Sequence, residues 1–263
     1  MISISTCFNY NVPLHKQLEM IKNARFEYVS ISSNYNHNGL LYNPDRLIKL
    51  IDKYNLKVDT IHGCVANNPE AFSILKKCSE VAYRLGASVV VIHPCDFFIT
   101  KDKVESKYEV LMNLCEKIIP IAKTYNIKYA IENLHPDGAT DVLKMALDKL
   151  DTNYFGMCYD ITHAQIDGPR KCNLIESYGD KIIAVHISDR IKEFVDHVVP
   201  GEGFIDFDYM LKKLAQISYY KPLLMEVLTD HTSYKEPEQL LSMTYKSGLE
   251  LVQKLASLRI KYN

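Results

Sequence analysis

The chain has 263 residues, of which 47% are hydrophobic and 24% charged, and its formal net charge is −1. This composition is typical of a soluble globular protein and lacks the overall basic excess that proteins bound to nucleic-acid phosphates usually show. No apolar run reaches the roughly 18 to 20 residues that cross a bilayer and no signal-peptide pattern is evident, so we expect no nucleic-acid partner and no membrane.

The pattern of apolar residues and turn residues predicts strands that alternate with helices. In chain order we expect strand 2–8, helix 14–23, strand 28–32, helix 44–54, strand 57–62, helix 68–85, strand 88–93, helix 103–125, strand 127–132, helix 140–150, strand 154–160, a loop with a short helix over 164–179, strand 181–187, a loop through 200–203, helix 207–217, strand 222–227 and helix 237–258. Pro44 suits the first turn of its helix, Gly86 closes another, and Pro120 should kink or split the long helix.

Repeated strand–helix units without a linker or low-complexity tract predict an α/β protein, a single (β/α)₈ TIM-barrel domain over residues 1–263. Seven cysteines are scattered without a C-x-x-C pair, which favours reduced thiols and a cytoplasmic location. They are Cys7, Cys64, Cys78, Cys95, Cys115, Cys158 and Cys172. The sequence leaves the oligomeric state open, a homo-oligomer included.

Several predicted strands end on a histidine or a carboxylate, and active sites of such barrels lie at this end. Four successive strands end on Glu132, Asp160, His186 and Glu226. Three carboxylates and one imidazole suit Mn²⁺, Mg²⁺, Co²⁺ or Zn²⁺, and a cation would neutralise acids that otherwise repel one another. Helix capping could explain any one of these acids, but it does not explain four on successive strands.

Further histidines are expected at the same end of the barrel, namely His62, His93, His163 and His197. Histidine is the commonest metal ligand and general acid or base, which favours a role in the site. The remaining four, His15, His37, His135 and His231, are interpreted as ordinary core or surface residues. Arg190 suits either a substrate hydroxyl or phosphate or a surface role, and Pro200–Gly203 is interpreted as a turn.

The sequence resembles the xylose isomerase-like TIM barrels, which include sugar phosphate isomerases, epimerases and apurinic endonucleases. The resemblance covers almost the whole chain and is carried by residues 91–94, 131–134, 158–164, 185–190, 197–207 and 225–227. It implies a divalent-metal-dependent sugar or sugar phosphate isomerase or epimerase whose metal ligands are Glu132, Asp160, His186 and Glu226. The metal would chelate a ketose carbonyl and the adjacent hydroxyl and hold the ene-diolate.

The resemblance also implies that Glu132 and Glu226 are the acid/base pair, one removing a carbon-bound proton and the other returning one. His163 and Arg190 would orient the substrate, a small sugar, with further contacts from His62, His93 and His197. One departure concerns specificity, because the segment 133–139 lacks the family's extra substrate-contacting glutamate. Phe8, Tyr35, Phe97 and Tyr159 are the candidates for a platform under the sugar ring, although core packing suits most of them.

An endonuclease IV-like enzyme with three zinc ions is the main alternative. Eight of its nine ligands have counterparts here: His62, His93, Glu132, Asp160, His163, His186, His197 and Glu226. The position of the ninth holds Val195, with Asp196 one place away, and the chain lacks basic excess. An inosose-dehydratase-like lyase would use the same metal and proton abstraction, and a catalytically silent binding barrel is disfavoured by the intact acid/base pair.

Overall fold

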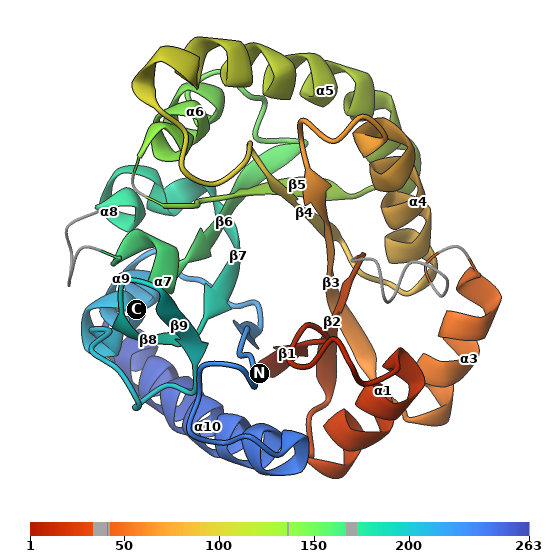
Figure 1. Cartoon of the computed structure of the whole chain (residues 1–263), viewed down its shortest axis with the longest axis vertical. Helices are drawn as coiled ribbons and strands as arrows, with labels where there is room; N and C mark the ends of the chain where they lie inside the picture. Colours follow the sequence, from red (N-terminus) through yellow and green to blue (C-terminus); the bar gives the residue numbers. More distant parts are fainter. Residues whose placement is uncertain (34–40, 42, 136, 167–172, 263) are drawn as a thin grey trace.

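The computed structural model describes residues 1–33, 41, 43–135, 137–166 and 173–262 (Figure 1). Within these residues, eight parallel strands form a closed barrel in the order β1-β10-β7-β6-β5-β4-β3-β2. Helices surround the barrel on its outside (Figure 1). The predicted (β/α)₈ fold is therefore confirmed, whereas the assignment of residues 1–263 to a single domain stays a prediction.

Most predicted elements are present, with ends that differ by a few residues. The barrel strands are β1 (Ile2–Ser5), β2 (Tyr28–Ser32), β3 (Lys57–Val65), β4 (Val89–His93), β5 (Lys128–Glu132), β6 (Phe155–Asp160), β7 (Ile182–Ile187) and β10 (Leu223–Met225). The described helices are α1 (Leu14–Asn23), α3 (Pro44–Lys53), α4 (Ala71–Arg84), α5 (Val104–Tyr125), α6 (Gly138–Leu147), α7 (Ile161–Ala164), α8 (Leu174–Tyr178), α9 (Phe207–Gln216) and α10 (Pro237–Tyr262), with short 3₁₀ helices at Lys101–Lys103 and Gly179–Lys181.

The alternation of side chains along the strands explains why polar residues meet at the barrel mouth. A small apolar cluster from β4 to β7 consists of Val89, Val91, Ala130, Cys158 and Ala184. Two residues after its members come His93, Glu132, Asp160 and His186. Because side chains repeat their direction every second residue, these four share the strand face of the cluster and point into the barrel. Intervening residues such as Ile131 and Val185 belong to the larger core beneath the helices.

Two expectations about local structure differ from the result. The long helix α5 is not split at Pro120, because the proline lies on the exposed side while Ile118 and Ile121 continue the buried face. The loop predicted after β7 contains an antiparallel hairpin of β8 (Asp189–Lys192) and β9 (Val195–Val198). This hairpin is short and irregular in register, so its sequence lacks a clean alternation. Gly86 has the left-handed backbone expected after a helix, with φ of +74°.

Among the described residues, no helix combines the length and the apolar character that a membrane span requires.

Candidate functional site

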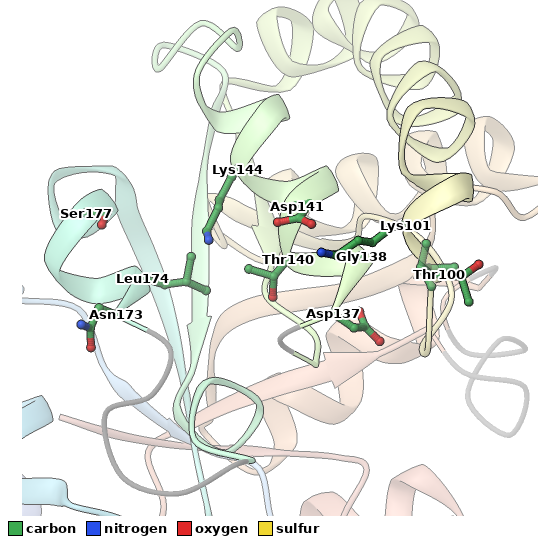
Figure 2. Close-up of a pocket in the computed structure, with 11 residues that line it drawn as sticks. Thr100, Lys101, Asp137, Gly138, Thr140, Asp141, Lys144, Asn173, Leu174 and Ser177 are labelled. Atoms are coloured by element: carbon green, nitrogen blue, oxygen red, sulfur yellow. The ribbon is translucent and has the colours of Figure 1, made fainter.

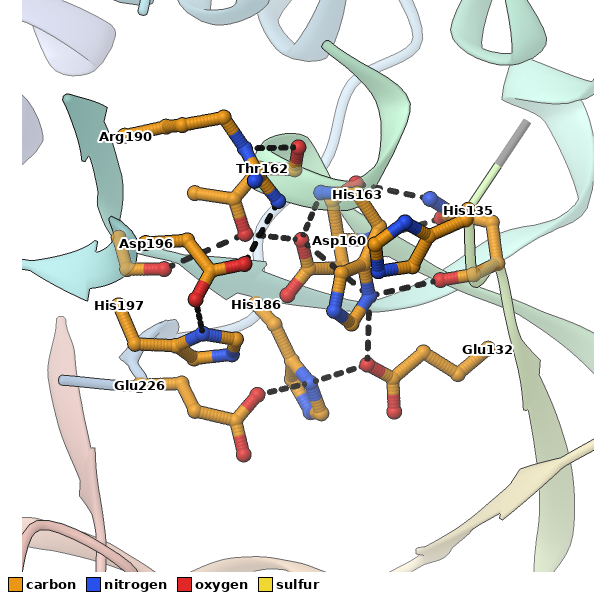
Figure 3. Close-up of polar contacts among 12 residues, drawn as sticks. Glu132, His135, Asp160, Thr162, His163, His186, Arg190, Asp196, His197 and Glu226 are labelled. Carbon is orange, nitrogen blue, oxygen red and sulfur yellow. Dashed lines mark hydrogen bonds and ion pairs between the residues drawn. The ribbon is translucent and has the colours of Figure 1, made fainter. Parts of the chain in front are cut away.

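The barrel mouth holds a cavity of about 170 Å³ at the C-terminal ends of the strands. Its lining consists of Cys7, Tyr10, Ser32, His62, His93, Phe97, Glu132, His163, His197, Glu226 and Leu228. Six predicted site residues are therefore at the cavity surface. Asp160 and His186 are fully buried next to Glu132 and Glu226, and all four come together in one cluster (Figure 3).

Glu132, the last residue of β5, is the centre of this cluster, with only 1% of its surface exposed. Its Oε2 lies 3.2 Å from Nε2 of both His62 and His93. Its Oε1 lies 3.1 Å from Nδ1 of His186 and 3.6 Å from Nδ1 of His163. Burial opposes ionisation, but the charges of His186 and His93 outweigh it and hold the pKa of Glu132 well below the usual value.

His186 lies between two glutamates that come from different strands, since β6 and β7 separate β5 from β10 in the barrel. Its Nδ1 is 2.7 Å from Oε2 of Glu226, which directly follows β10. Burial disfavours the charged imidazole, but Cys158, Glu132 and Glu226 together raise the pKa of His186 well above its usual value. In turn, His186 overcomes the burial of Glu226 and lowers the pKa of that carboxyl to about 2. Both glutamates are therefore ionised at neutral pH.

Asp160 presents one carboxylate oxygen that has no hydrogen bond. Its Oδ1 caps helix α7 by accepting from the Thr162 hydroxyl at 2.6 Å and from the backbone N–H of His163 at 2.7 Å. Its Oδ2 is buried and finds no hydrogen-bond partner in the described parts of the chain. A buried, unpaired carboxylate oxygen is costly, and a bound cation would satisfy it.

The donor set fits a divalent ion. One ligand atom from each of Glu132, Asp160, His186 and Glu226 lies within 4.8 Å of the other three. Three carboxylates with one imidazole suit hard to borderline cations. Two overlapping groups meet the same distance criterion, namely His62 with Glu132 and His186, and Asp160 with His163 and His197.

Arg190 uses its guanidinium to bind protein groups and does not line the cavity. The side chain is completely buried, with Nε donating to the Thr162 carbonyl at 3.1 Å and Nη2 donating to Oδ2 of Asp196 at 2.7 Å. Nη1 donates to the carbonyl of Glu193. Arg190 thus fastens the β8–β9 hairpin to the start of helix α7.

Asp196, on β9, contacts both Arg190 and His197, so it links the Arg190 contacts to the cavity that His197 lines. Its Oδ1 lies 3.0 Å from Nδ1 of His197, and although burial of His197 acts against its charge, the acid raises the pKa of that imidazole to about 9. The histidines around Glu132 and Asp160 therefore come from the barrel strands, from α7 and from the hairpin.

The turn Pro200–Gly203 is held by a buried acid that sequence reasoning did not single out. Oδ2 of Asp189 accepts from the backbone N–H groups of Gly201 at 2.8 Å and Gly203 at 2.9 Å, and Oδ1 accepts from Ile205 at 3.1 Å. A β-carbon at Gly203 would lie 2.1 Å from the carbonyl oxygen of Arg190. The turn is thus a packed structural segment whose amides already have an acceptor.

Asn133 is another residue whose role the sequence did not reveal. Its side-chain amide donates to the carbonyl of Asp160 at 2.9 Å and accepts from the Asp160 N–H at 2.8 Å. Its own carbonyl lies 3.0 Å from Nδ1 of His163. Asn133 therefore sets the relative position of Glu132, Asp160 and His163, and the only signal in the sequence is its place directly after a strand-end acid.

The remaining candidates are distributed as follows. His135 is nearly buried beside His163, and burial lowers its pKa, whereas Nδ1 of His231 lies 3.0 Å from the Asp196 carbonyl. Phe8 and Tyr159 are core residues, so among the platform candidates that the structure describes only Phe97 lies at the cavity. His37, Tyr35 and Cys172 lie outside the described residues.

A second, larger hollow of about 490 Å³ lies beside the start of helix α6 and is lined by residues from the segments that follow β4, β5 and β6 (Figure 2). Its lining includes Lys101, Asp137, Asp141, Lys144 and Asn173. None of the predicted site residues lines it, and none of its lining residues that the structure describes is a histidine or a cysteine. The cavity lined by the predicted histidines and glutamates is therefore the one at the barrel mouth.

Comparison with known proteins agrees with this architecture. The sequence profile of the family described as xylose isomerase-like TIM barrel matches residues 18–249. The inosose isomerase of Bacillus subtilis is 26% identical over 206 residues, covering 72% of this chain and 71% of that protein. Protein y4fM of Sinorhizobium fredii is 28% identical over 192 residues. The match covers 71% of this chain and 61% of the length of y4fM.

Solved structures show the same fold. A D-tagatose 3-epimerase-like protein superposes with a TM-score of 0.79 at 22% identity, covering 100% of this chain and 99% of the other. The IOLI protein with a binding zinc atom gives a TM-score of 0.70 at 22% identity, covering 100% and 99%.

We expect the purified protein to bind about one divalent ion per chain through the four clustered ligands. The variant Glu132→Ala/Asp160→Ala should lose this ion, because it lacks two of the four ligands. The measurement is metal analysis after dialysis against each candidate ion. Asp141→Ala, which removes an acid from the second hollow, is the control and should retain it; full occupancy in the double variant would contradict the assignment.

Replacing Arg190 by Met should destabilise the protein by about 2 to 4 kcal/mol, because Asp196 would lose its buried partner. Arg84→Met is the matched control, since its partner Asp45 is exposed. That variant should lose at most about 1 kcal/mol. Urea denaturation of both variants measures the difference, and equal losses would show that the hairpin does not depend on Arg190.

Proposed function

Because the chain belongs to the xylose isomerase-like TIM barrel family, we propose that it is a divalent-metal-dependent isomerase or epimerase of a small sugar or sugar phosphate. The observation that carries this proposal is the pairing of two buried glutamates across one imidazole. Glu132 and Glu226 lie 3.1 and 2.7 Å from the same nitrogen of His186, and both line the cavity.

The two glutamates have the properties that a proton-transfer pair requires. They come from β5 and from the end of β10, so they approach the cavity from different sides of the barrel. Their pKa values are lowered, so each carboxylate can accept a proton at neutral pH. One carboxylate removes the proton next to a carbonyl. The other takes up a proton from solvent and delivers it to the opposite face in an epimerase or to the neighbouring carbon in an isomerase, and the first glutamate then releases its proton to solvent.

The ion would be held by Glu132, Asp160, His186 and Glu226, and when bound it would supply the positive charge that stabilises negative charge on the substrate oxygens. The chain's other residues have separate tasks. His62, His93 and His163 face the cavity and can hydrogen-bond substrate hydroxyls. Arg190, expected to orient the substrate, is instead proposed to position His197 through Asp196.

The similar proteins support a carbohydrate or related polyol as substrate. Relatives in several bacilli carry the name inosose isomerase. Similar structures include D-psicose 3-epimerase with D-tagatose and 3-keto-D-glucoside 4-epimerase. These names share the removal or relocation of a proton beside a carbonyl, which matches the chemistry available to Glu132 and Glu226.

A three-zinc endonuclease remains the second candidate, and the two additional ligand groups around His62 and His197 favour it. The position of the ninth zinc ligand argues against it. That position holds Val195, and the carboxylate of the neighbouring Asp196 is bound by Arg190. The net charge of −1 also disfavours a protein that grips DNA phosphates. A dehydratase of the same family would use the same glutamates and differs only in the group that leaves.

Glu226→Gln should lower the exchange of a carbon-bound ketose proton with D₂O by about 10²- to 10⁴-fold, because an amide cannot accept the proton. Proton NMR of a panel of ketoses with added Mn²⁺ measures this exchange. Glu176→Gln changes an exposed acid on α8 and should exchange at the wild-type rate. A Glu226→Gln protein that keeps the fold and the full rate would exclude Glu226 as a proton-transfer group.

The wild-type protein should not cleave duplex DNA at abasic sites, because the site lacks the complete three-zinc ligand set. A gel assay with a synthetic abasic duplex and added Zn²⁺ tests this. Efficient metal-dependent nicking, accompanied by three zinc ions per chain, would make the endonuclease the better assignment.

A further inference from the structure

The barrel mouth carries three neighbouring phenylalanines, Phe97, Phe98 and Phe194, which we call the aromatic wall. Their exposed fractions are 39%, 61% and 60%. The ring centroids of Phe97 and Phe98 lie 6.4 Å apart, and those of Phe98 and Phe194 lie 6.2 Å apart. Two of the residues precede α5, and Phe194 lies between β8 and β9, so the wall joins segments that are distant in the sequence.

The aromatic wall continues directly from the candidate active site. Phe97 lines the cavity, and its ring lies 5.7 Å from that of His93 and 5.8 Å from that of His163. Phe98 and Phe194 extend the aromatic surface from Phe97 towards solvent. A molecule whose polar part occupies the cavity would therefore meet phenyl rings at its outer end.

The backbone at Phe98 indicates that its exposed position is maintained at a cost. Its φ is +61°, a left-handed conformation that a bulky side chain seldom adopts. Such conformations concentrate at functional and ligand-binding positions. The ring also contacts the nearly buried His135, with centroids 4.9 Å apart, which keeps it next to the cavity.

We propose that the aromatic wall binds an apolar, planar group attached to the polyol, so that the preferred substrate is a glycoside or similarly substituted sugar that still carries a carbonyl, such as a keto-glycoside. The inference rests on the proposed function, because that function places the polyol in the cavity. Aromatic groups pack favourably edge-to-face or offset on phenylalanine rings. A phosphate at this position would gain nothing from the wall, since none of its three side chains carries a charge or a hydrogen-bond donor.

Calorimetric titration of the full chain, loaded with Mn²⁺, with methyl and phenyl β-glycosides of the same pyranose tests the proposal. The glucose, galactose, mannose and xylose series are used in turn. For the series that binds, the phenyl glycoside should bind about ten-fold more tightly, as expected for one added aromatic contact. In Phe98→Ala/Phe194→Ala the ratio of the two affinities should fall to about one.

Tyr83→Ala is the matched control, because Tyr83 is also 61% exposed but lies near the end of α4, away from the mouth. It should keep the ten-fold ratio. Circular dichroism checks the fold of each variant, and Phe194→Ala alone replaces the double variant if that protein does not fold. Equal affinities in the wild type, no binding of either glycoside, or a ratio unchanged in the folded variants would overturn the proposal.

The outcome is separable from that of the proton-exchange experiment, because calorimetry requires no turnover. A phenyl preference without exchange would retain the aromatic wall and reject the proposed reaction. Exchange without a phenyl preference would do the reverse. Sedimentation velocity adds a further check: a wild-type dimer that the double variant dissociates would assign the wall to a second copy of the chain and overturn the proposal.

Discussion

The structure depends on placing three carboxylates in a buried space without leaving their charges uncompensated. Glu132, Asp160 and Glu226 are separated by short distances at the barrel mouth, and burial alone would drive the two glutamates to the neutral form. In this structure His186 provides the compensating charge through one nitrogen shared by two glutamates. The unpaired oxygen of Asp160 shows that the compensation is incomplete, which is the physical reason for expecting a cation.

The surrounding residues serve to keep this arrangement fixed. Small side chains such as Ala130 and Ala184 lie below Glu132 and His186 on the same strands. Asn133 joins β5 to β6 through a pair of hydrogen bonds, and Asp160 starts α7 with its own carboxylate. A site held by backbone-anchored bonds on rigid strands keeps its geometry better than one carried on loops.

Much of the barrel and its mouth could be predicted from the sequence because both follow the two-residue period of the strands. That period places His93, Glu132, Asp160 and His186 on one face, and it needs no knowledge of the tertiary structure. The roles of Asn133, Asp189 and Asp196 could not be predicted in this way. Their partners are chosen by the folded arrangement; Asn133, for example, binds a residue 27 positions away. Similarly, the sequence offered substrate or surface as roles for Arg190, whereas burial gives it an internal one.

The β8–β9 hairpin supplies both His197 beside the acids and Phe194 in the aromatic wall, and it is fastened through Arg190 to α7 and through Asp189 to the turn at Gly201. Its tip can therefore change in length or composition while its base stays attached. For laboratory evolution, this makes the hairpin a candidate graft point: exchanging residues 191–195 between related barrels would replace Phe194 in the aromatic wall and leave the four clustered residues Glu132, Asp160, His186 and Glu226 in place.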